Sequence, residues 1–210
     1  MKRKLLLIIA LFACSFGTKA QWISQAVPFG STAYFFDLEA TGPLTLWGNP
    51  LYISGTTAST TRDYFRTTDG GLTWISYGVM TGTPANYKVS NLWPIDDLTC
   101  YAAMYSATAT GGNVYKTVDG GLNWTNTNAY NASSPFPNFV YFFDAAHGLT
   151  MGDPQGGYFE IYTTADSGAT WTRTPTANIP LPAAVDDYGT VNRFTAIQGH
   201  IWFATTYGSI

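Results

Sequence analysis

The sequence has little charge and almost no glutamate. Only 10 of its 210 residues are Lys or Arg and 13 are Asp or Glu, and Glu39 and Glu160 are its only glutamates. Good helix formers are therefore scarce, which disfavours a helical fold. A disordered chain would be rich in charge and poor in aromatics, whereas this one has 7 Trp, 14 Tyr and 13 Phe. Abundant Thr, Tyr, Phe, Trp and Gly are typical of short strands and tight turns, so we predict an all-β protein.

Cysteine is equally rare, and one of the two lies in a segment that we expect to be removed. The basic residues 2–4, the apolar run Leu5–Ala13 and the small residues Thr18 and Ala20 form the three parts of a secretory signal peptide. The apolar run is too short to cross a membrane. Cleavage after residue 20 leaves Cys100 alone, so we predict no intrachain disulfide and a thiol buried in a strand.

The other cysteine raises the alternative of a lipid anchor. Leu11–Cys14 is similar to the lipobox of bacterial lipoproteins, in which the cysteine is acylated. Phe12 fits that pattern poorly, and cleavage after Ala20 fits better. We therefore predict an exported protein, secreted or on the outer cell surface, with the periplasm as an alternative location and acylation of Cys14 as the less favoured outcome.

Basic residues become still scarcer once residues 1–20 are removed. Four of the ten are lost, which leaves six against 13 acidic residues, a net charge of about −7. Such a surface excludes nucleic acid as a partner. No second hydrophobic stretch is long enough to cross a bilayer. No His, Cys or carboxylate stands at metal-ligand spacing from His147 or His200, so we predict neither a metal nor a cofactor.

One short motif occurs three times, at Thr67–Trp74, Thr117–Trp124 and Thr164–Trp171. Each copy reads Thr-x-Asp-x-Gly-x-x-Trp, and the tryptophans lie 50 and 47 residues apart. A period of about 50 residues is the length of one four-stranded propeller blade. We assign a structural role to the motif residues Thr67, Asp69, Gly71, Trp74, Thr117, Asp119, Gly121, Trp124, Thr164, Asp166, Gly168 and Trp171.

The motif has the chemistry of a hairpin turn. Asp-Gly between two β-rich segments is a strong hairpin signal, and a glycine at the second place in every copy indicates a positive φ. Short Asp and Thr side chains suit hydrogen bonds to the turn's own amides, and the Trp offers an apolar face beneath the turn. A catalytic residue has no reason to recur in every repeat. We therefore predict that these aspartates hold turns together.

Four strands can be placed in the same order in each repeat. The predicted first strands are Tyr34–Asp37, Trp93–Asp96 and Tyr141–Asp144; the second are Leu44–Trp47, Cys100–Met104 and Leu149–Met151; the third are Tyr64–Thr67, Val114–Thr117 and Phe159–Thr164. The fourth strand follows the turn and carries the Trp. Trp22–Ser24 matches Trp74–Ser76, so we predict that the chain begins with an outermost strand that closes the last blade.

The motif resembles the Asp-box, or BNR repeat, and the resemblance covers nearly all of residues 21–210. It implies a β-propeller of four-stranded antiparallel blades. The repeat pattern is most similar to the photosystem II assembly-factor and sortilin-like propellers of secreted bacterial proteins. We expect about three and a half blades, an incomplete ring from a seven-bladed propeller. We also expect sequence beyond Ile210 that includes a C-terminal sorting domain. We divide the chain into a signal peptide (1–20), a closing outer strand (21–30), three blades (31–78, 88–128, 136–175) and the start of another (188–210).

Strand order predicts which end of the blades carries function. The motif turns share one end with the turns that follow the first strands, near Asp37, Asp144 and His147. Long loops are left at the other end, where binding residues concentrate on a rigid scaffold. These loops are Asn49–Asp63, Tyr77–Ser90, Tyr105–Asn113, Thr125–Asn138, Gly152–Tyr158 and Thr174–Thr190. The candidate ligand-binding residues are Arg62, Tyr87, Tyr105, Tyr130, Phe136, Asp153, Tyr158, Asp186, Asp187 and Tyr188.

Aromatic faces with a few carboxylates suit carbohydrate or peptide recognition. We predict a non-catalytic scaffold that binds a protein or a glycan, with no residue assigned to catalysis. The alternative is a glycoside hydrolase, xyloglucanase-like, with two opposed carboxylates drawn from Asp153, Asp186 and Asp187 or from beyond the chain. A sialidase is less favoured, because it needs an arginine cluster and an Arg-Ile-Pro-like motif that Arg62 and the few other arginines do not form.

Overall fold

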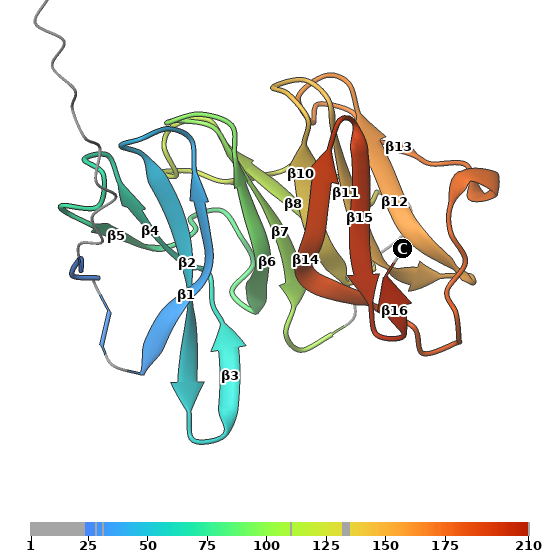
Figure 1. The fold of residues 1–210 in the computed structure, drawn as a ribbon, viewed down its shortest axis with the longest axis horizontal. Helices are drawn as coiled ribbons and strands as arrows, with labels where there is room; N and C mark the ends of the chain where they lie inside the picture. Colours follow the sequence, from blue (N-terminus) through green and yellow to red (C-terminus); the bar gives the residue numbers. More distant parts are fainter. Residues whose placement is uncertain (1–23, 28, 31, 110, 132–134, 210) are drawn as a thin grey trace, which may run out of the picture.

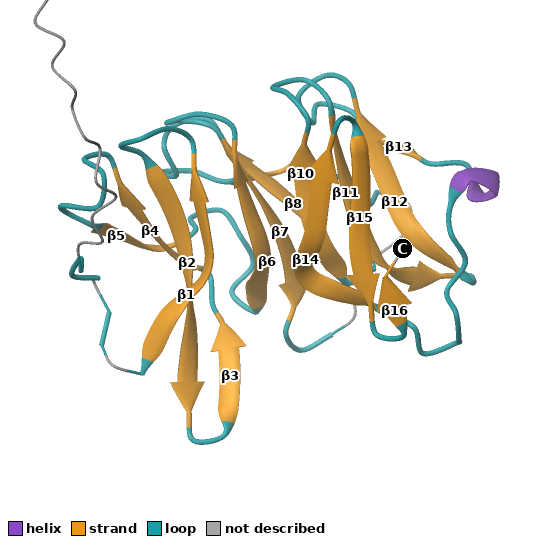
Figure 2. Ribbon diagram, in the orientation of Figure 1, coloured by secondary structure: helices purple, strands orange, loops and turns teal. Residues whose placement is uncertain are grey.

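The computed structural model describes residues 24–27, 29, 30, 32–109, 111–131 and 135–209. Within these ranges the chain forms strands, turns and one short 3₁₀ helix, η1 (Thr176–Asn178), and no α-helix. The all-β prediction is confirmed (Figures 1 and 2). The described part of the chain contains no helix with the length and hydrophobicity that a membrane crossing requires. The expected signal peptide, with Cys14, lies outside the described residues.

The strands form four antiparallel sheets, each in chain order. The first sheet contains β1 (Ala33–Ala40), β2 (Leu46–Ser54), β4 (Asp63–Thr67) and β5 (Ile75–Val79), with β3 (Thr57–Thr60) paired to β2. The second contains β6 (Tyr87–Pro94), β7 (Cys100–Ser106), β8 (Gly112–Thr117) and β9 (Thr125–Asn126). The third contains β10 (Pro137–Phe142), β11 (Gly148–Gln155), β12 (Tyr158–Thr164) and β13 (Thr172–Arg173). The fourth contains β14 (Gly189–Ile197), β15 (His200–Thr205) and β16 (Gly208–Ser209).

This is the blade topology of a β-propeller. The first strands of successive sheets contact one another, β1 with β6, β6 with β10 and β10 with β14. These strands therefore lie on the inner side of the sheets, which follow one another in chain order (Figure 1). The chain is a β-propeller type of protein, as the repeat predicted.

The core consists of three clusters, one between each pair of successive sheets. Trp47 and Tyr64 pack with Cys100 and Trp124 between the first and second sheets. The second cluster contains Tyr101, Val114, Tyr130, Phe142 and Tyr162, and the third contains Phe139, Met151, Phe159 and Phe203. These large side chains form the core, which explains why the chain is rich in aromatic residues. Cys100 is a buried free thiol in β7, as predicted.

Each motif turn is closed by the same hydrogen bonds; we call these three turns the repeat turns. In the first, the Thr67 hydroxyl accepts the Gly71 N–H at 2.9 Å and donates to Asp69 Oδ1 at 2.7 Å. The Asp69 carboxylate accepts the N–H and the hydroxyl of Thr73, at 2.9 and 2.6 Å. Thr117 with Asp119, and Thr164 with Asp166, form the equivalent bonds.

Both glycine places of the repeat turn, the fourth and fifth residues of the motif, adopt a positive φ, whereas a positive φ was predicted for the second place. The second place has φ between 75° and 98° in Gly71, Gly121 and Gly168. The first place is also left-handed, and Ser167 occupies it at φ 59°. The first place therefore accepts a side chain only with backbone strain. At the second place, a Cβ on Gly121 would lie 2.2 Å from the Tyr64 hydroxyl, so both space and φ require glycine there.

Strand ends differ from the predictions at several points. Asp37 lies inside β1, whereas the predicted strand ended there. β6 ends at Pro94, and Asp96 closes the next turn by accepting the N–H groups of Leu98 and Thr99. Each motif Trp comes just before its fourth strand, because β5, β9 and β13 begin at the next residue.

One predicted loop and one predicted strand are also corrected. The predicted loop Asn49–Asp63 is mostly a hairpin of β2 and β3, closed by a two-residue turn that begins with Gly55 at φ 61°. Glycine at that place is favoured in two-residue hairpin turns. The described part of the predicted closing strand, residues 24–27, 29 and 30, contains no strand. It covers the first sheet instead, where the Phe29 ring lies edge-on to Phe35 at 4.9 Å. Trp22 and Ile23 lie outside the described residues.

Candidate functional site

Hydrogen bonds fix the two ends of the sheets. The repeat turns bond the turns that follow the first strands: Gly70 N–H to Leu44 C=O at 2.8 Å, and Gly120 N–H to Leu98 C=O at 2.9 Å. Ser167 makes the third such bond. We call this the turn end. The opposite end, the loop end, carries the β2–β3 hairpin, the β7–β8 and β11–β12 connections, and the links between sheets (Figure 1).

Two neighbouring hollows open at the loop end. The Arg62 hollow, of about 480 Å³, is lined by Ser59, Thr60, Thr61, Arg62, Asp63, Val79, Ala85, Asn86, Tyr87, Lys88 and Ala107. The Tyr188 hollow, of about 470 Å³, is lined by Ala107, Thr108, Ala109, Gly111, Phe136, Asp153, Pro154, Gln155 and Tyr188. Ala107 lines both, so the two hollows adjoin.

Half of the candidate residues meet at these hollows. Arg62 and Tyr87 line the first, and Phe136, Asp153 and Tyr188 line the second. Tyr105 is connected to them because its ring stacks on Phe136 with centroids 4.2 Å apart. The fold therefore brings these predicted residues together from three different sheets and their links.

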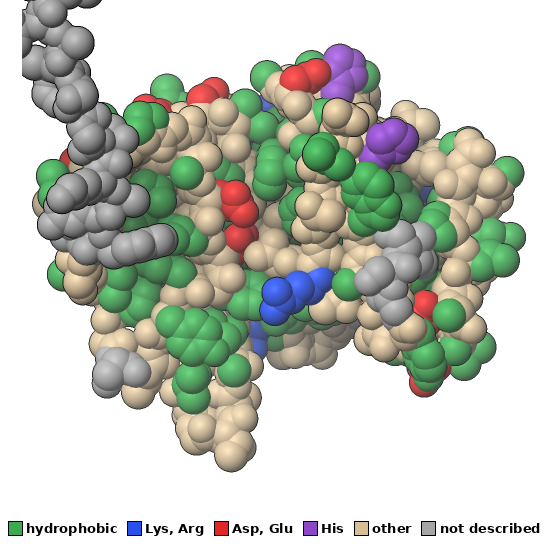
Figure 3. All heavy atoms as spheres, viewed as in Figure 1, with side chains coloured by type: hydrophobic (Ala, Val, Ile, Leu, Met, Phe, Trp, Pro, Cys, Tyr) green, Lys and Arg blue, Asp and Glu red, His purple; other side chains and the backbone are tan. Residues whose placement is uncertain are grey.

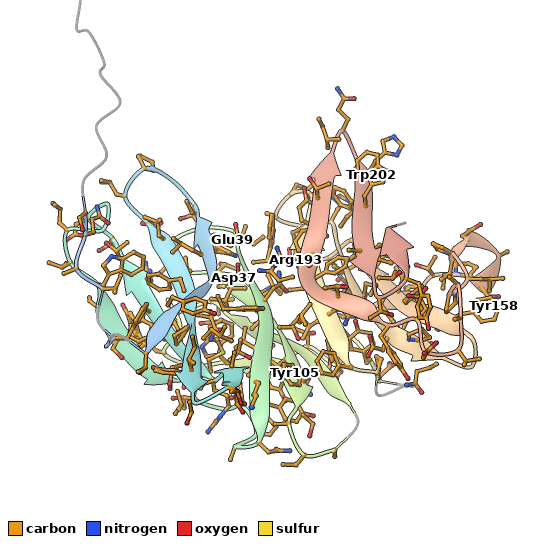
Figure 4. All side chains as sticks on the ribbon, turned by 60° about the horizontal axis from the view of Figure 1, so that its bottom comes forward. Asp37, Glu39, Tyr105, Tyr158, Arg193 and Trp202 are labelled. Carbon is orange, nitrogen blue, oxygen red and sulfur yellow. The ribbon has the colours of Figure 1, made fainter. Side chains whose placement is uncertain are left out.

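Four other candidates lie elsewhere or have structural partners. Tyr130 is buried in the core, where its hydroxyl pairs with the Thr150 hydroxyl at 2.8 Å, so it cannot contact a ligand. Tyr158 packs against the third core cluster, away from Tyr105 (Figure 4). Asp187 is buried, and its carboxylate accepts the Ala183 N–H at 2.8 Å. Asp186 is exposed and accepts the Tyr207 hydroxyl at 2.8 Å.

Asp153 is the carboxylate of the Tyr188 hollow. Its Oδ1 accepts the Asn138 side-chain amide at 3.1 Å and the Gly189 N–H at 3.0 Å. Burial raises its pKa to about 6 against the lowering effect of these bonds. The carboxylate thus joins the third sheet to β14.

A second acidic feature lies on the inner side of the sheets, where sequence reasoning had placed no site. Asp37 and Glu39 alternate on β1, so both side chains point to one face. Figure 4 shows them facing Arg193, which points toward them from β14. An adjoining groove of about 410 Å³ between β1 and β14 is lined by Tyr34, Phe35, Phe36, Leu51, Thr190, Val191, Asn192 and Arg193. We call this region the inner groove.

The pKa values of both inner carboxyl groups, Asp37 and Glu39, are raised. Burial raises the pKa of Asp37 to about 6, although the Leu92 N–H and the Asn192 side chain hydrogen-bond its carboxylate and oppose the shift. Burial and then the neighbouring Asp37 charge raise the pKa of Glu39 to about 7. One sequence signal could have found this pair: Glu39 is one of two glutamates and stands two residues from an aspartate. Among the described residues, no three His, Cys, Asp or Glu gather as they would around a metal ion.

Comparisons with known proteins identify the architecture. No family model and no curated protein sequence matches the chain. Solved structures do match. YCF48 from Cyanidioschyzon merolae aligns with a TM-score of 0.56 at 18% identity, over 85% of this chain and 52% of that one. An ancestral GH74 enzyme aligns with a TM-score of 0.51 at 15% identity, over 83% of this chain and 26% of that one.

A structure of YCF48 bound to a D1 peptide also aligns, with a TM-score of 0.49 at 14% identity, over 83% of this chain and 63% of that one. The chain therefore spans about half to two thirds of the length of the YCF48 structures that it matches. At these identities the two matches with TM-scores of 0.56 and 0.51 show a common fold, the β-propeller.

Proposed function

We propose that the protein is an exported scaffold that binds a protein or a glycan at its loop end and has no catalytic activity. The adjoining hollows carry this proposal, because the chain brings aromatic and polar side chains from separate sheets to one place there. The carboxylates near the hollows already hold the structure together. Asp63 accepts the Thr61 hydroxyl, Asp153 joins two sheets, and Asp187 closes its own loop.

The finer assignments belong to the same proposal. We assign the repeat turns to the Asp-box class, because each uses its Thr and Asp side chains to bond the backbone of the turn. The sequence pattern is similar to that of the assembly-factor and sortilin-like propellers. Export rests on the signal peptide predicted in residues 1–20.

A glycoside hydrolase is the second candidate, and the inner groove is the observation that favours it. A glycosidase needs one protonated and one ionised carboxyl group, and two groups with pKa values near 6 and 7 could divide these roles near neutral pH. The scaffold is favoured over the enzyme because the Asp37 carboxylate is buried and bonded to β6. Asp153, Asp186 and Asp187 do not form such a pair either, since each is bonded to different loop atoms.

The test screens the mature chain, beginning at Gln21, against glycan arrays, peptide arrays and polysaccharide substrates. We expect a ligand whose binding is lost in Tyr188→Ala and kept in Trp202→Ala, an exposed aromatic on β15 that lines neither hollow. Release of reducing sugar by the mature chain that is abolished by Glu39→Gln would overturn the scaffold and establish the hydrolase. Binding that is unaffected by substitutions in either hollow would overturn the loop end as the site.

A further inference from the structure

Some of the few basic residues of this chain are bonded within the fold, and others line hollows. Outside residues 1–20 they are Arg62, Arg66, Lys88, Lys116, Arg173 and Arg193. Arg66 and Lys116 donate to repeat-turn carbonyls, those of Gly120 and Ser167, and Arg173 forms an ion pair with Glu160 at 2.6 Å. Of the three others, Arg193 faces the inner groove, and Arg62 and Lys88 line the same hollow. In a chain with a net charge near −7, two of six basic residues thus meet at one place.

Neither cation of the Arg62 hollow is neutralised by a carboxylate. One Arg62 nitrogen, Nη1, donates to the Thr83 carbonyl at 3.0 Å, and the Lys88 ammonium donates to the Ser59 hydroxyl. The acidic residue in the hollow is Asp63, whose Oδ2 accepts the Thr61 hydroxyl at 3.0 Å. Ion pairs within the described residues involve other positions. A guanidinium has five N–H donors and an ammonium three, so both cations keep donors for an incoming anion.

Thr60 supplies an independent observation that points to a ligand. This residue lines the same hollow and is only 5% exposed, yet its hydroxyl has no hydrogen-bond partner among the described residues. Unpaired buried polar groups are uncommon in folded proteins, because burial without a partner costs stability. A polar group that enters the hollow and reaches this hydroxyl would give it a partner.

The rest of the lining selects the class of ligand. Ser59, Thr61 and Asn86 bring further hydroxyl and amide groups, and Tyr87 brings a half-buried aromatic ring. Val79, Ala85 and Ala107 complete the lining with apolar surface. Hydroxyl groups beside apolar and aromatic faces match a sugar, whose ring has both kinds of surface. The volume of about 480 Å³ lies within the range of roughly 300–1,000 Å³ that small-molecule sites occupy.

We propose that the Arg62 hollow binds an acidic saccharide, with the anionic group between Arg62 and Lys88 and the ring hydroxyls toward Ser59, Thr60 and Asn86. The proposal refines the scaffold function by naming the ligand class of one loop-end hollow, and it rests on that function. The anionic group is a carboxylate or a sulfate, since either accepts charge-assisted hydrogen bonds from both cations.

The test titrates the mature chain by calorimetry with three disaccharides of similar size: one with a terminal uronate, one with a sulfate and one uncharged. We expect the better of the two charged sugars to bind at least tenfold more tightly than the uncharged one. Its affinity should fall as salt is raised from 50 to 500 mM, because the contact is electrostatic. Which charged sugar binds better distinguishes carboxylate from sulfate.

The variants assign the site. Lys88→Gln and Arg62→Gln should each weaken charged-sugar binding at least tenfold, and Thr60→Val, which keeps the side-chain shape, should weaken it severalfold. Trp202→Ala, which changes an exposed aromatic residue that lines neither hollow, is the matched control and should leave it unchanged. Thermal unfolding of each variant separates lost binding from lost folding.

Three results would overturn the proposal. One is equal affinity for charged and uncharged sugars, and another is charged-sugar binding that survives Lys88→Gln. The third is binding of a glutamate-rich peptide through Arg62 and Lys88 while all three sugars fail, which would assign the hollow to a protein partner. Binding of other ligands through Tyr188 would then leave the scaffold function standing, so the two proposals can fail separately.

Discussion

At the turn end the three repeat turns repeat one another bond for bond, whereas at the loop end each described connection is built differently. The repeat turns share their Thr and Asp hydrogen bonds. Each also accepts a hydrogen bond from a side chain that precedes its sheet. The loop end has a hairpin extension at β2–β3, a longer β7–β8 connection and a Gly156–Gly157 turn at β11–β12. Both solvent-facing hollows with the predicted residues lie at the variable end. The repeated end therefore builds the scaffold, and the varied end is free to acquire specificity.

At the turn end, each repeat turn accepts a hydrogen bond at the same backbone carbonyl, but from a different type of side chain. The carbonyl at the first glycine place accepts a bond from Gln25 in the first turn, Arg66 in the second and Lys116 in the third. Arg66 and Lys116 come from the preceding sheet and also lie over an aromatic ring. Gln25 comes from the segment before β1. That segment therefore takes the place of a preceding sheet on the first repeat turn.

The largest expected effect contrasts one glycine from each end. Gly121→Ala places a Cβ 2.2 Å from the buried Tyr64 hydroxyl at φ 98°, and should destabilise by about 3 kcal/mol or more. Gly55→Ala, in the β2–β3 turn at φ 61°, meets open space and should cost about 1 kcal/mol from backbone strain alone. Denaturant unfolding of both variants measures the difference. Equal losses would show that the repeat turns are no more tightly packed than the loop end.

The second prediction uses pH to contrast the turn end with the inner groove. Hydrogen bonds from Thr73 and Thr67 lower the pKa of Asp69 to about 2, so its contribution to stability is present above about pH 4 and lost as pH falls toward 2. Burial raises the pKa of Asp37 to about 6, so its contribution has the opposite sign: present below about pH 4 and lost as pH rises through 6. Stability should therefore be greatest near pH 4.

Asp37→Asn isolates the inner carboxyl, because the amide oxygen can still accept the Leu92 N–H. The substitution should remove only part of the decline between pH 4 and 7, because burial also raises the pKa values of Glu39 and Asp153. It should raise stability at pH 7 by roughly 3 kcal/mol at most, the value of a shift of two pKa units. Unfolding free energies at pH 4, 5.5 and 7 measure the slope. An unchanged slope would mean that Asp37 is not the group that titrates, and Glu39→Gln is the matched comparison.

The turn end could be predicted from the sequence, whereas the inner groove could not. The repeat turn could be read because its bonds join residues at most four positions apart, Thr67 with Gly71 and Asp69 with Thr73. The inner groove could not, because the partners of Asp37 are Leu92 and Asn192, on strands that only the fold brings near. Tyr130 was misplaced for the same reason: its burial depends on its packing against the third sheet.

The loop end was half predictable. Strand order identified it as the end away from the repeat turns, and long polar loops marked Arg62, Asp153 and Tyr188. The convergence of Lys88 and Thr60 on Arg62 could not be foreseen, because both lie on strands where the sequence showed loops or no site. The β2–β3 hairpin that carries Thr60 depends on Gly55-Thr56, a weaker turn signal than Asp-Gly.

A smaller loss of stability is expected where a repeat-turn carbonyl accepts hydrogen bonds from two donors. The Ser167 carbonyl accepts the Tyr101 hydroxyl at 2.6 Å and the Lys116 ammonium at 2.8 Å. Tyr101→Phe removes one of them and should cost about 1 kcal/mol, since the second donor keeps the carbonyl paired. Tyr64→Phe in the preceding interface should cost more, because the Tyr64 hydroxyl donates to the buried Gly121 carbonyl, for which no other donor is recorded in the described residues. Thermal unfolding compares the pair, and a larger loss in Tyr101→Phe would contradict this ranking.

The smallest effect tests whether the leading segment truly stands in for a preceding sheet. Gln25 donates to the Gly70 carbonyl at 2.8 Å in an exposed position, so Gln25→Ala should cost only about 0.5 kcal/mol. Gln25→Lys would place the same kind of donor there that Lys116 offers to the third turn, and should retain the stability that the alanine variant loses. Hydrogen exchange of the Gly71 amide reports on this turn directly, because the hydrogen bond from this N–H to the Thr67 hydroxyl exists only in the closed turn. Faster exchange in the alanine variant and normal exchange in the lysine variant would give Gln25 the same structural role as the donors from a preceding sheet. Unchanged exchange in both would mean that the first repeat turn, unlike the other two, closes without a docking partner.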